Sequence, residues 1–181
     1  MSDVTYTPID SSVPVEDILK VSQPSRRQKD GAGMRVGNRS EFTLVADVVQ
    51  PDGADRFRER VAKAQAEAGY WEGRLGTVHD LRIGLINDDK QFLFAATYSD
   101  EFKPYVADVA KFATPWIDYM FVGVADGFPG MSSPDALEYL AAHQVEALVW
   151  FASNADATPR DITRSLHVSS AVNTFLDAVQ S

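Results

Sequence analysis

Apolar and polar residues alternate along three stretches of the chain, and this alternation predicts β-strands, because successive side chains of a strand point to opposite faces. The stretches cover residues 41–49, 78–86 and 91–98. A polar turn at 87–90 separates the last two, which predicts a β-hairpin. A short, continuously apolar run at 147–152 predicts a fourth strand.

Between and after these strands, apolar residues recur every three or four positions, which is typical of amphipathic helices. The predicted helices cover 54–70, 101–112, 116–124, 133–143 and 161–179. Proline directly after Ser or Thr marks several helix starts, as at Thr114-Pro115 and Thr158-Pro159. The last helix is expected to bury its apolar residues, which are Ile162, Leu166, Ala171, Phe175, Leu176 and Val179.

The order of elements is β-α-β-β-α-β followed by a helix, which predicts an α+β fold of the ferredoxin-like, split β-α-β type. Its four-stranded antiparallel sheet carries helices on one face. Residues 1–40 hold several prolines and show weak periodicity, so they are interpreted as an N-terminal arm, and 41–181 as the ferredoxin-like domain. A sheet with one bare face favours a homodimer in which two such faces pair.

Strand alternation also assigns side chains to faces. In 78–86, His79 falls on the same face as Leu81 and Ile83, which is expected to lie under the helices, whereas Asp80 and Arg82 fall on the other. Arg82 beside Asp80 is typical of a solvated ion pair, although an arginine on an open face can also stabilise negative charge on a substrate. The residues expected on the open face are Asp47, Arg82, Tyr98 and Trp150.

The composition of the chain excludes or disfavours several classes of function. The 181 residues carry a formal net charge of −9, and an acidic body disfavours nucleic-acid binding. The chain has no cysteine, which excludes disulfides and thiolate metal sites, and the spacing of its three histidines predicts no metal site. No apolar run has the length of a membrane span and no signal peptide is visible, so we expect a cytoplasmic protein without a membrane partner.

The order of elements, with the run from Thr77-Val78-His79 through Tyr98 into a helix containing Tyr105, resembles the dimeric α+β-barrel superfamily over roughly residues 40–181. That group includes small monooxygenases, polyketide cyclases, chlorite-dismutase-like proteins and dye-decolourising peroxidases. The resemblance implies a homodimeric oxygenase-, peroxidase- or cyclase-type enzyme of specialised metabolism that acts on a small apolar molecule. The alternative is a non-catalytic ligand-binding or assembly protein that uses the sheet face as a dimer interface.

The segment Gly123-Val-Ala-Asp126-Gly127 matches the Gly-x-x-Asp-Gly pattern of dye-decolourising peroxidases, and it equally matches a helix end with glycine caps. The resemblance implies an acid–base role for Asp126, a distal cation at Arg82 and haem ligation by His167 or His143. A cofactor-free enzyme is the other possibility. The candidate catalytic residues are Arg82, His79, Asp47 and Asp126. The candidate substrate-pocket residues are Tyr98, Trp116, Tyr119 and Trp150, although aromatic side chains more often fill a core.

Overall fold

The computed structural model describes residues 26–27, 33–67, 69–70 and 76–180. The first 25 residues of the predicted N-terminal arm lie outside the described residues. The elements, in chain order, are β1 (Arg26–Arg27), β2 (Met34–Val36), β3 (Arg39–Asp47), α1 (Gly53–Gln65), β4 (Val78–Ile86), β5 (Gln91–Ser99), α3 (Phe102–Phe121), α4 (Ala136–Ala142) and α5 (Pro159–Gln180).

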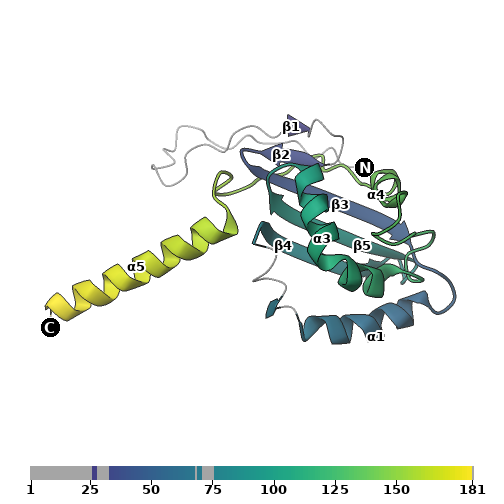
Figure 1. Ribbon diagram of the computed structural model, residues 1–181, viewed down its shortest axis with the longest axis horizontal. Coiled ribbons are helices and arrows are strands. Elements are labelled where there is room, and N and C mark those ends of the chain that lie inside the picture. The colour runs from purple at the N-terminus through teal and green to yellow at the C-terminus, as the bar shows by residue number, and fades with distance from the viewer. Residues whose placement is uncertain (1–25, 28–32, 68, 71–75, 181) are drawn as a thin grey trace, which may run out of the picture.

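The strands form one antiparallel sheet in the order β1-β2-β3-β5-β4 (Figure 1). The hairpin of β4 and β5 turns at Asn87, Asp88 and Asp89, which all have positive φ angles of 51–64°. Asn and Asp tolerate this left-handed conformation better than other non-glycine residues. The predicted α+β class, the antiparallel sheet and the hairpin are therefore confirmed.

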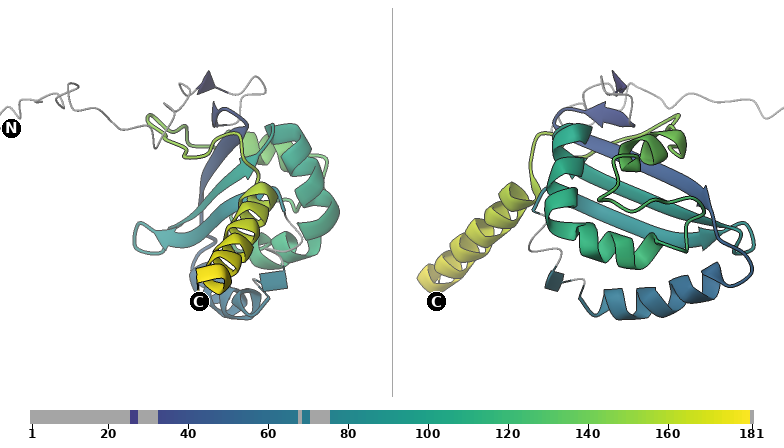
Figure 2. Two further views of the ribbon diagram at one scale, coloured as in Figure 1. Left: turned by 90° about the vertical axis from the view of Figure 1, so that its left-hand side faces the viewer. Right: turned by 45° about the vertical axis from the view of Figure 1, so that its right-hand side comes forward.

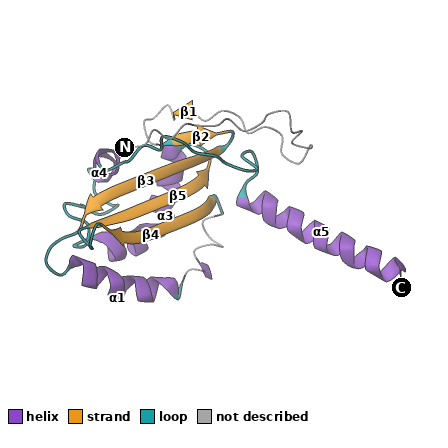
Figure 3. Cartoon of the chain, turned by 180° about the vertical axis from the view of Figure 1, so that it is seen from behind, coloured by secondary structure: helices purple, strands orange, loops and turns teal. Residues whose placement is uncertain are grey.

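Helix α3 crosses one face of the sheet, and α1 runs beside the β4 edge (Figures 1 and 3). Among the residues that the structure describes, no helix covers the other face. Phe121 near the end of α3 packs against rings from α1 and from the sheet, with its centroid 6.1 Å from Phe57 and 5.2 Å from Phe92. Tyr98 stacks on Tyr105 of α3 with centroids 3.9 Å apart. Burial of these aromatic side chains between helix and sheet contributes to the apolar core.

Helix α3 is continuous, although two helices separated at Thr114-Pro115 were predicted. Pro115 cannot donate the usual backbone hydrogen bond to the carbonyl four residues earlier. The hydroxyl of the preceding Thr114 donates to the Ala110 carbonyl at 2.5 Å. Ala113 and Ile117, on either side of the proline, are both buried against the sheet. Packing along the whole length of the helix therefore outweighs the local preference of proline for a helix start.

The predicted strand at 147–152 is wrong. Leu148 and Phe151 lie in a loop with 95% and 81% of their surface exposed. The chain reaches the edge of β3 slightly earlier, where Gln144 forms an isolated bridge with Leu44 and the Val145 N–H donates to the Thr43 carbonyl at 2.9 Å. Strand β2 already occupies the start of this edge, so only a short pairing remains for the returning chain.

The expected burial of the last helix is also wrong. Helix α5 extends away from the body of the chain and has no buried residue (Figures 1 and 2). Leu166, Phe175 and Val179 are 65–67% exposed, and Leu176 is 47% exposed. The periodicity correctly predicted an amphipathic helix, but periodicity does not identify the surface that the apolar side meets.

Candidate functional site

Figure 3 shows the side of the sheet that no described helix covers, here called the open face. The pairing of the strands places side chains of β3, β5 and β4 in rows across this face. Residues paired between neighbouring strands point to the same side of a sheet. The rows, from one end of β3 to the other, are Arg39–Ser99, Glu41–Thr97–Asp80, Thr43–Ala95–Arg82, Val45–Leu93–Gly84 and Asp47–Gln91–Ile86.

His79 joins the open face because the pairing of β4 with β5 shifts by one residue between Val78 and Asp80. A β-bulge of this kind adds a residue and breaks the alternation of side chains. The His79 Nε2 atom lies 2.8 Å from the Ser99 hydroxyl oxygen, and Ser99 belongs to the open face. The expectation that His79 shares a face with Leu81 is therefore wrong, and the bulge is the physical reason.

Burial and the neighbouring Arg39 guanidinium lower the pKa of His79 to about 4, although Asp80 opposes the shift. The imidazole is therefore neutral at pH 7 and keeps one nitrogen as an acceptor. In the tautomer whose Nε2–H donates to Ser99, that acceptor is Nδ1. Strongly perturbed titratable groups are enriched at functional sites, so this end of the sheet is the best candidate.

Two further charged groups lie near His79. Burial lowers the pKa of Arg39, and Asp80 partly offsets this effect. The Arg39 Nη2 atom donates to the Asn154 carbonyl at 3.4 Å, whereas its buried Nε–H has no hydrogen-bond acceptor in the part of the chain that the structure describes. A buried donor without an acceptor costs free energy unless a ligand or solvent satisfies it.

Glu41, in the neighbouring row, is 6% exposed. Burial raises the pKa of its carboxyl, although two donors oppose the shift. These donors are the Met34 N–H at 2.8 Å and the Thr43 hydroxyl at 3.2 Å. The result is a patch, here called the Arg39–His79 patch, that comprises Arg39, Glu41, His79, Asp80 and Ser99.

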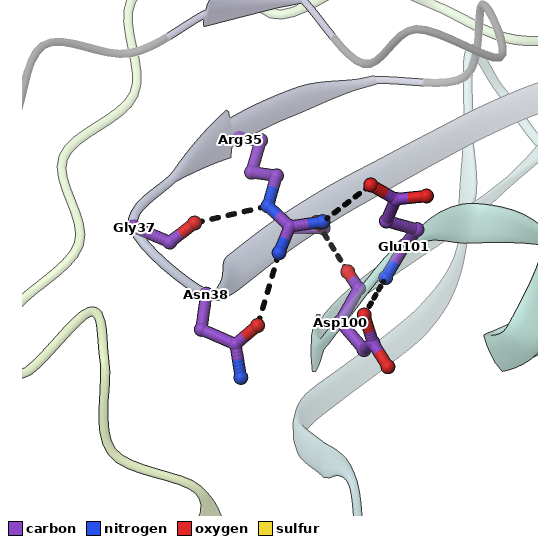
Figure 4. A network of polar contacts seen from close by, with 6 residues as sticks. Arg35, Gly37, Asn38, Asp100 and Glu101 are labelled. Atoms are coloured by element: carbon purple, nitrogen blue, oxygen red, sulfur yellow. Dashed lines mark hydrogen bonds and ion pairs between the residues drawn. The ribbon is translucent and has the colours of Figure 1, made fainter.

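The end of β5 that holds Ser99 is fixed by a polar network around Arg35 (Figure 4). The Arg35 guanidinium donates to the Gly37 carbonyl at 2.9 Å and to Asn38 Oδ1 at 3.0 Å, and it lies 3.5 Å from a carboxylate oxygen of Glu101. The Asp100 carbonyl, next to Ser99, accepts a hydrogen bond from the Ser40 hydroxyl at 2.7 Å. Ser99 is therefore held in place by contacts from β2, β3 and the start of α3.

The four predicted catalytic residues do not form one site. Asp47 and Asp126 lie together at the opposite end of the sheet, where the Asp126 N–H donates to the Asp47 carbonyl at 2.8 Å. Arg39 and Asp47 are eight residues apart on β3, which is about 27 Å at about 3.4 Å per residue. Arg82 forms an ion pair with Asp80 at 3.7 Å, with 75% and 52% of the two side chains exposed, as expected of a solvated pair.

The four predicted pocket aromatics are also dispersed. Tyr98 is fully buried on the helix side of the sheet, because alternation along β5 places it on the same face as Phe92, Phe94 and Ala96. The expectation that Tyr98 lies on the open face is therefore wrong. Trp116 packs against the core from α3. Tyr119 is 41% exposed on the same helix, 5.5 Å below the Arg60 guanidinium, and Trp150 lies in the loop after α4.

The described residues do not fit a haem. His143 stacks on Tyr139 with centroids 4.0 Å apart, and its Nδ1 lies 2.9 Å from the Tyr139 carbonyl oxygen. His167 is exposed on α5 and lines neither of the two cavities described below. The apolar cavity between the sheet and α3 has a volume of about 50 Å³, whereas pockets for organic ligands have about 300–1,000 Å³. A hollow of about 530 Å³ lies at the Asp47–Asp126 end of the sheet, but its lining contains no histidine that could bind the iron.

Within the described ranges, no group of three or more His, Cys, Asp or Glu side chains is arranged to hold a metal ion. No helix there combines the length and apolar character needed to cross a bilayer. No protein-family model, curated protein or solved structure matches the chain.

Sequence reasoning missed Arg39, Glu41 and Ser99. Arg39 was assigned to the N-terminal arm, and Glu41 was treated only as the first residue of a strand. The available signal was the alternation of polar residues at 39, 41, 97 and 99 on two predicted neighbouring strands. Such a pattern indicates a polar surface, and only the register of β3 with β5 shows that it is continuous.

The low pKa of His79 makes the stability of the fold depend on pH. Between pH 6.5 and about 4 the unfolded chain binds a proton at His79 that the folded chain does not, so stability is present above pH 6.5 and is lost as the pH falls toward 4. The ring is only partly buried, so solvent screening reduces the loss to about 1 kcal/mol. The raised pKa of Glu41 has the opposite effect, because it stabilises the folded chain as the pH falls. Glu41 is therefore kept unchanged in the test.

The measurement is urea unfolding of the wild type and of His79→Gln at several pH values in this window. The wild type is expected to lose more stability than the variant as the pH falls. Equal losses, or a His79 imidazole that titrates near 6.5 in an NMR experiment, would contradict the assignment.

Proposed function

We propose that this chain is a small-molecule enzyme whose site is the Arg39–His79 patch on the open face. The observation that supports it best is a neutral histidine held by Ser99 beside an arginine with an unsatisfied buried donor. A neutral imidazole can accept a proton, and a neighbouring cation can stabilise the anion that forms. Because the pKa of His79 is about 4 in the free chain, the transfer also requires the bound anion to offset the charge of Arg39 and raise that pKa.

In the proposed reaction, His79 Nδ1 accepts a proton from an acidic C–H or O–H of the substrate, and the electron pair stays on the substrate as an enolate. The enolate oxygen accepts a hydrogen bond from Arg39. Ser99 accepts the His79 Nε2–H and orients the ring. Cofactor-free oxygenases and cyclases both begin with such a step, so the patch supports these two classes better than a peroxidase.

The substrate class follows from the composition of the face. Beyond Thr43 and Ala95, the next row is formed by Val45, Leu93 and Gly84, which offers an apolar surface along the strands. An apolar molecule with one ionisable enol therefore fits the face, with the enol at Arg39 and the apolar part over Leu93. A cytoplasmic role in specialised metabolism remains part of this proposal.

The finer fold assignment is also a proposal. The order β3, α1, β4, β5, α3, with β3 beside β5, supports a ferredoxin-like relationship for this part of the chain. In a dimeric α+β barrel, each open face is covered by the partner's sheet. We propose a homodimer as well, because an open face with apolar rows is incompletely buried in one chain.

A non-catalytic assembly protein is the second candidate, and helix α5 is the observation that favours it. An amphipathic helix without a buried residue indicates a contact with another molecule. The two candidates make different demands on the Arg39–His79 patch. An enzyme uses a histidine with a perturbed pKa there, whereas an assembly protein requires none.

The test uses a hydroxynaphthoquinone, which is a flat apolar molecule with one acidic enol, and its methyl ether as the matched ligand without the ionisable proton. We expect the enol to bind at least about tenfold more tightly than the ether, since a charge-assisted hydrogen bond contributes about 1.5–3 kcal/mol. Binding of the anion beside Arg39 is expected to raise the pKa of His79, because it offsets the charge of Arg39.

Calorimetry measures the affinities and NMR measures the His79 titration. Arg39→Gln is expected to abolish the preference for the enol, whereas the control variant Arg82→Gln, at an exposed arginine of the same face, keeps it. An unchanged preference in Arg39→Gln, or an unmoved His79 titration at saturating enol, argues against this site.

A further inference from the structure

The apolar cavity between the sheet and α3 lies inside the core, away from the open face. Side chains of β3 and β5 form one wall, α3 forms the opposite wall, and the segment 128–140 closes one end. Its volume is about 50 Å³. The side chains that line it are aromatic or aliphatic, with one methionine, and they include Leu44, Phe94, Val106, Val109, Ile117 and Leu140.

Water is a poor occupant of this cavity. A buried water needs about two to four polar partners, but the surface that lines the cavity is apolar throughout. The lining includes two tyrosines, which are engaged elsewhere. The Tyr139 hydroxyl donates to the Asp126 carbonyl at 3.0 Å, and the Tyr105 ring stacks on Tyr98. An apolar cavity of this kind stays free of water and takes up apolar molecules instead.

The volume of the cavity limits its ligand to a very small molecule. One water needs about 10–15 Å³ of such space, whereas an apolar cavity of about 150 Å³ binds benzene or xenon. The volume of about 50 Å³ lies between these two values. It therefore suits a molecule of about two or three heavy atoms and is too small for an aromatic ring.

We propose that the cavity between the sheet and α3 is a binding site for a small apolar gas, with dioxygen as the ligand. Dioxygen has two heavy atoms and no hydrogen-bonding requirement, so it loses little when it leaves water. In the cavity it gains dispersion contacts with ring and methyl carbons on all sides.

The gas is expected to enter at the end of the cavity that Met131 lines. There the cavity is closed by partly buried side chains, which belong to Met131, Tyr139 and Leu140. Helix α4, which carries two of them, has seven residues and buries only Ala136. A methionine side chain is flexible and adapts its shape, so this end offers the least resistance to a small molecule.

The sheet separates the gas site from the Arg39–His79 patch. Phe42 and Phe94 point from the sheet into the cavity, whereas Glu41 and Thr97 lie on the open face. This inference therefore goes beyond the proposed function and does not depend on it. A failed enol-binding test would leave the gas site unaffected, and a failed gas-binding test would leave the patch unchanged.

The first test uses dioxygen itself with the wild-type chain. Dioxygen is paramagnetic, so it accelerates the NMR relaxation of methyl groups beside it. We expect an enhancement at least about twofold larger for methyl groups that line the cavity than for buried methyl groups that do not. The lining set is Leu44, Val106 and Val109, and the comparison set is Val36 and Val124. Equal enhancement in the two sets would overturn the proposal.

Xenon, an apolar atom that binds such cavities, is the second probe. Methyl chemical shifts are recorded at rising gas pressure. The shifts of Leu44 and Ile117 are expected to saturate, as binding at a defined site requires, whereas the exposed Leu148 and Val149 shift linearly. Linear shifts at all four residues would show that no gas site exists.

A cavity-filling variant tests the position of the site. Val106→Ile/Val109→Ile adds two methylene groups, each about as large as a water molecule, and so fills most of the cavity. It is expected to lose the saturable xenon shift. Its midpoint of thermal unfolding should rise by about 2–4 °C, because filling a cavity stabilises a core.

The matched control is Val168→Ile/Val172→Ile, which makes the same change on the exposed helix α5. It is expected to keep both the xenon shift and the unfolding midpoint of the wild type. A saturable shift that persists in the cavity-filling variant would place xenon elsewhere and overturn the assignment. If that variant does not fold, the dioxygen measurement on the wild type decides.

Discussion

Replacing Phe121 with alanine is expected to lower the free energy of unfolding by about 3–5 kcal/mol, the usual range for a buried phenylalanine. Phe121 is 4% exposed, and its ring contacts four others. The centroids of these rings lie 5.2–6.4 Å away, and the rings belong to Phe57, Phe92, Phe94 and Phe128. The substitution therefore leaves a cavity where α1, α3 and the sheet meet.

Urea unfolding at neutral pH provides the measurement, with Phe151→Ala as the matched control. Phe151 is the same residue type but is 81% exposed in a loop, so its removal is expected to change stability by no more than about 0.5 kcal/mol. A loss below about 1 kcal/mol for Phe121→Ala would show that α3 does not pack on the sheet as described.

Replacing Gly33 with alanine is expected to destabilise the chain by at least about 3 kcal/mol, because the change combines backbone strain with a steric clash. Gly33 has a φ of 78°, in the left-handed region that a side chain disfavours. A Cβ atom at this position would lie 1.9 Å from the Glu41 carbonyl oxygen. The clash is with backbone, so a change of rotamer cannot relieve it.

Gly84→Ala is the matched control, since a Cβ atom there meets nothing within 4 Å. Alanine in a strand loses less backbone entropy on folding than glycine, so this variant is expected to be unchanged or more stable by about 0.5–1 kcal/mol. Thermal or urea unfolding distinguishes the two glycines. Similar stability of Gly33→Ala and the wild type would contradict the close approach of Gly33 to β3.

The Gly33 variant also bears on the candidate site. The next residue, Met34, donates its N–H to the Glu41 carboxylate at 2.8 Å. Displacement of Gly33 would weaken this bond and disturb the neighbouring row of the Arg39–His79 patch. The extended patch therefore depends on the β2 segment as well as on the central hairpin.

The hairpin of β4 and β5 and the start of α3 were predictable because their signals are local. Apolar residues alternate on both sides of Asn87-Asp88-Asp89, and a helical pattern follows directly. Local pattern gave a wrong strand at 147–152. An apolar run predicts that a segment is buried, but it cannot show whether a sheet edge is free to pair with that segment. Here β2 had already taken part of that edge.

The site was less predictable than the fold. His79 was selected from the sequence, but strict alternation placed it on the wrong face, because a bulge depends on pairing with β5 and leaves no clear local signal. Arg39, Glu41 and Ser99 became candidates only when the register placed them together. Asp47 and Asp126 came together as well, at the far end of the sheet from His79.

By itself, the sequence determined the positions of β3, β4, β5, α1 and α5, since periodicity and turn chemistry act over a few residues. It also determined that α5 is amphipathic. Only the tertiary structure decided which edge of β3 is occupied, which face His79 joins and that α5 leaves the body of the chain. These outcomes depend on contacts between residues far apart in the chain, and an apolar periodicity is compatible with many different partners.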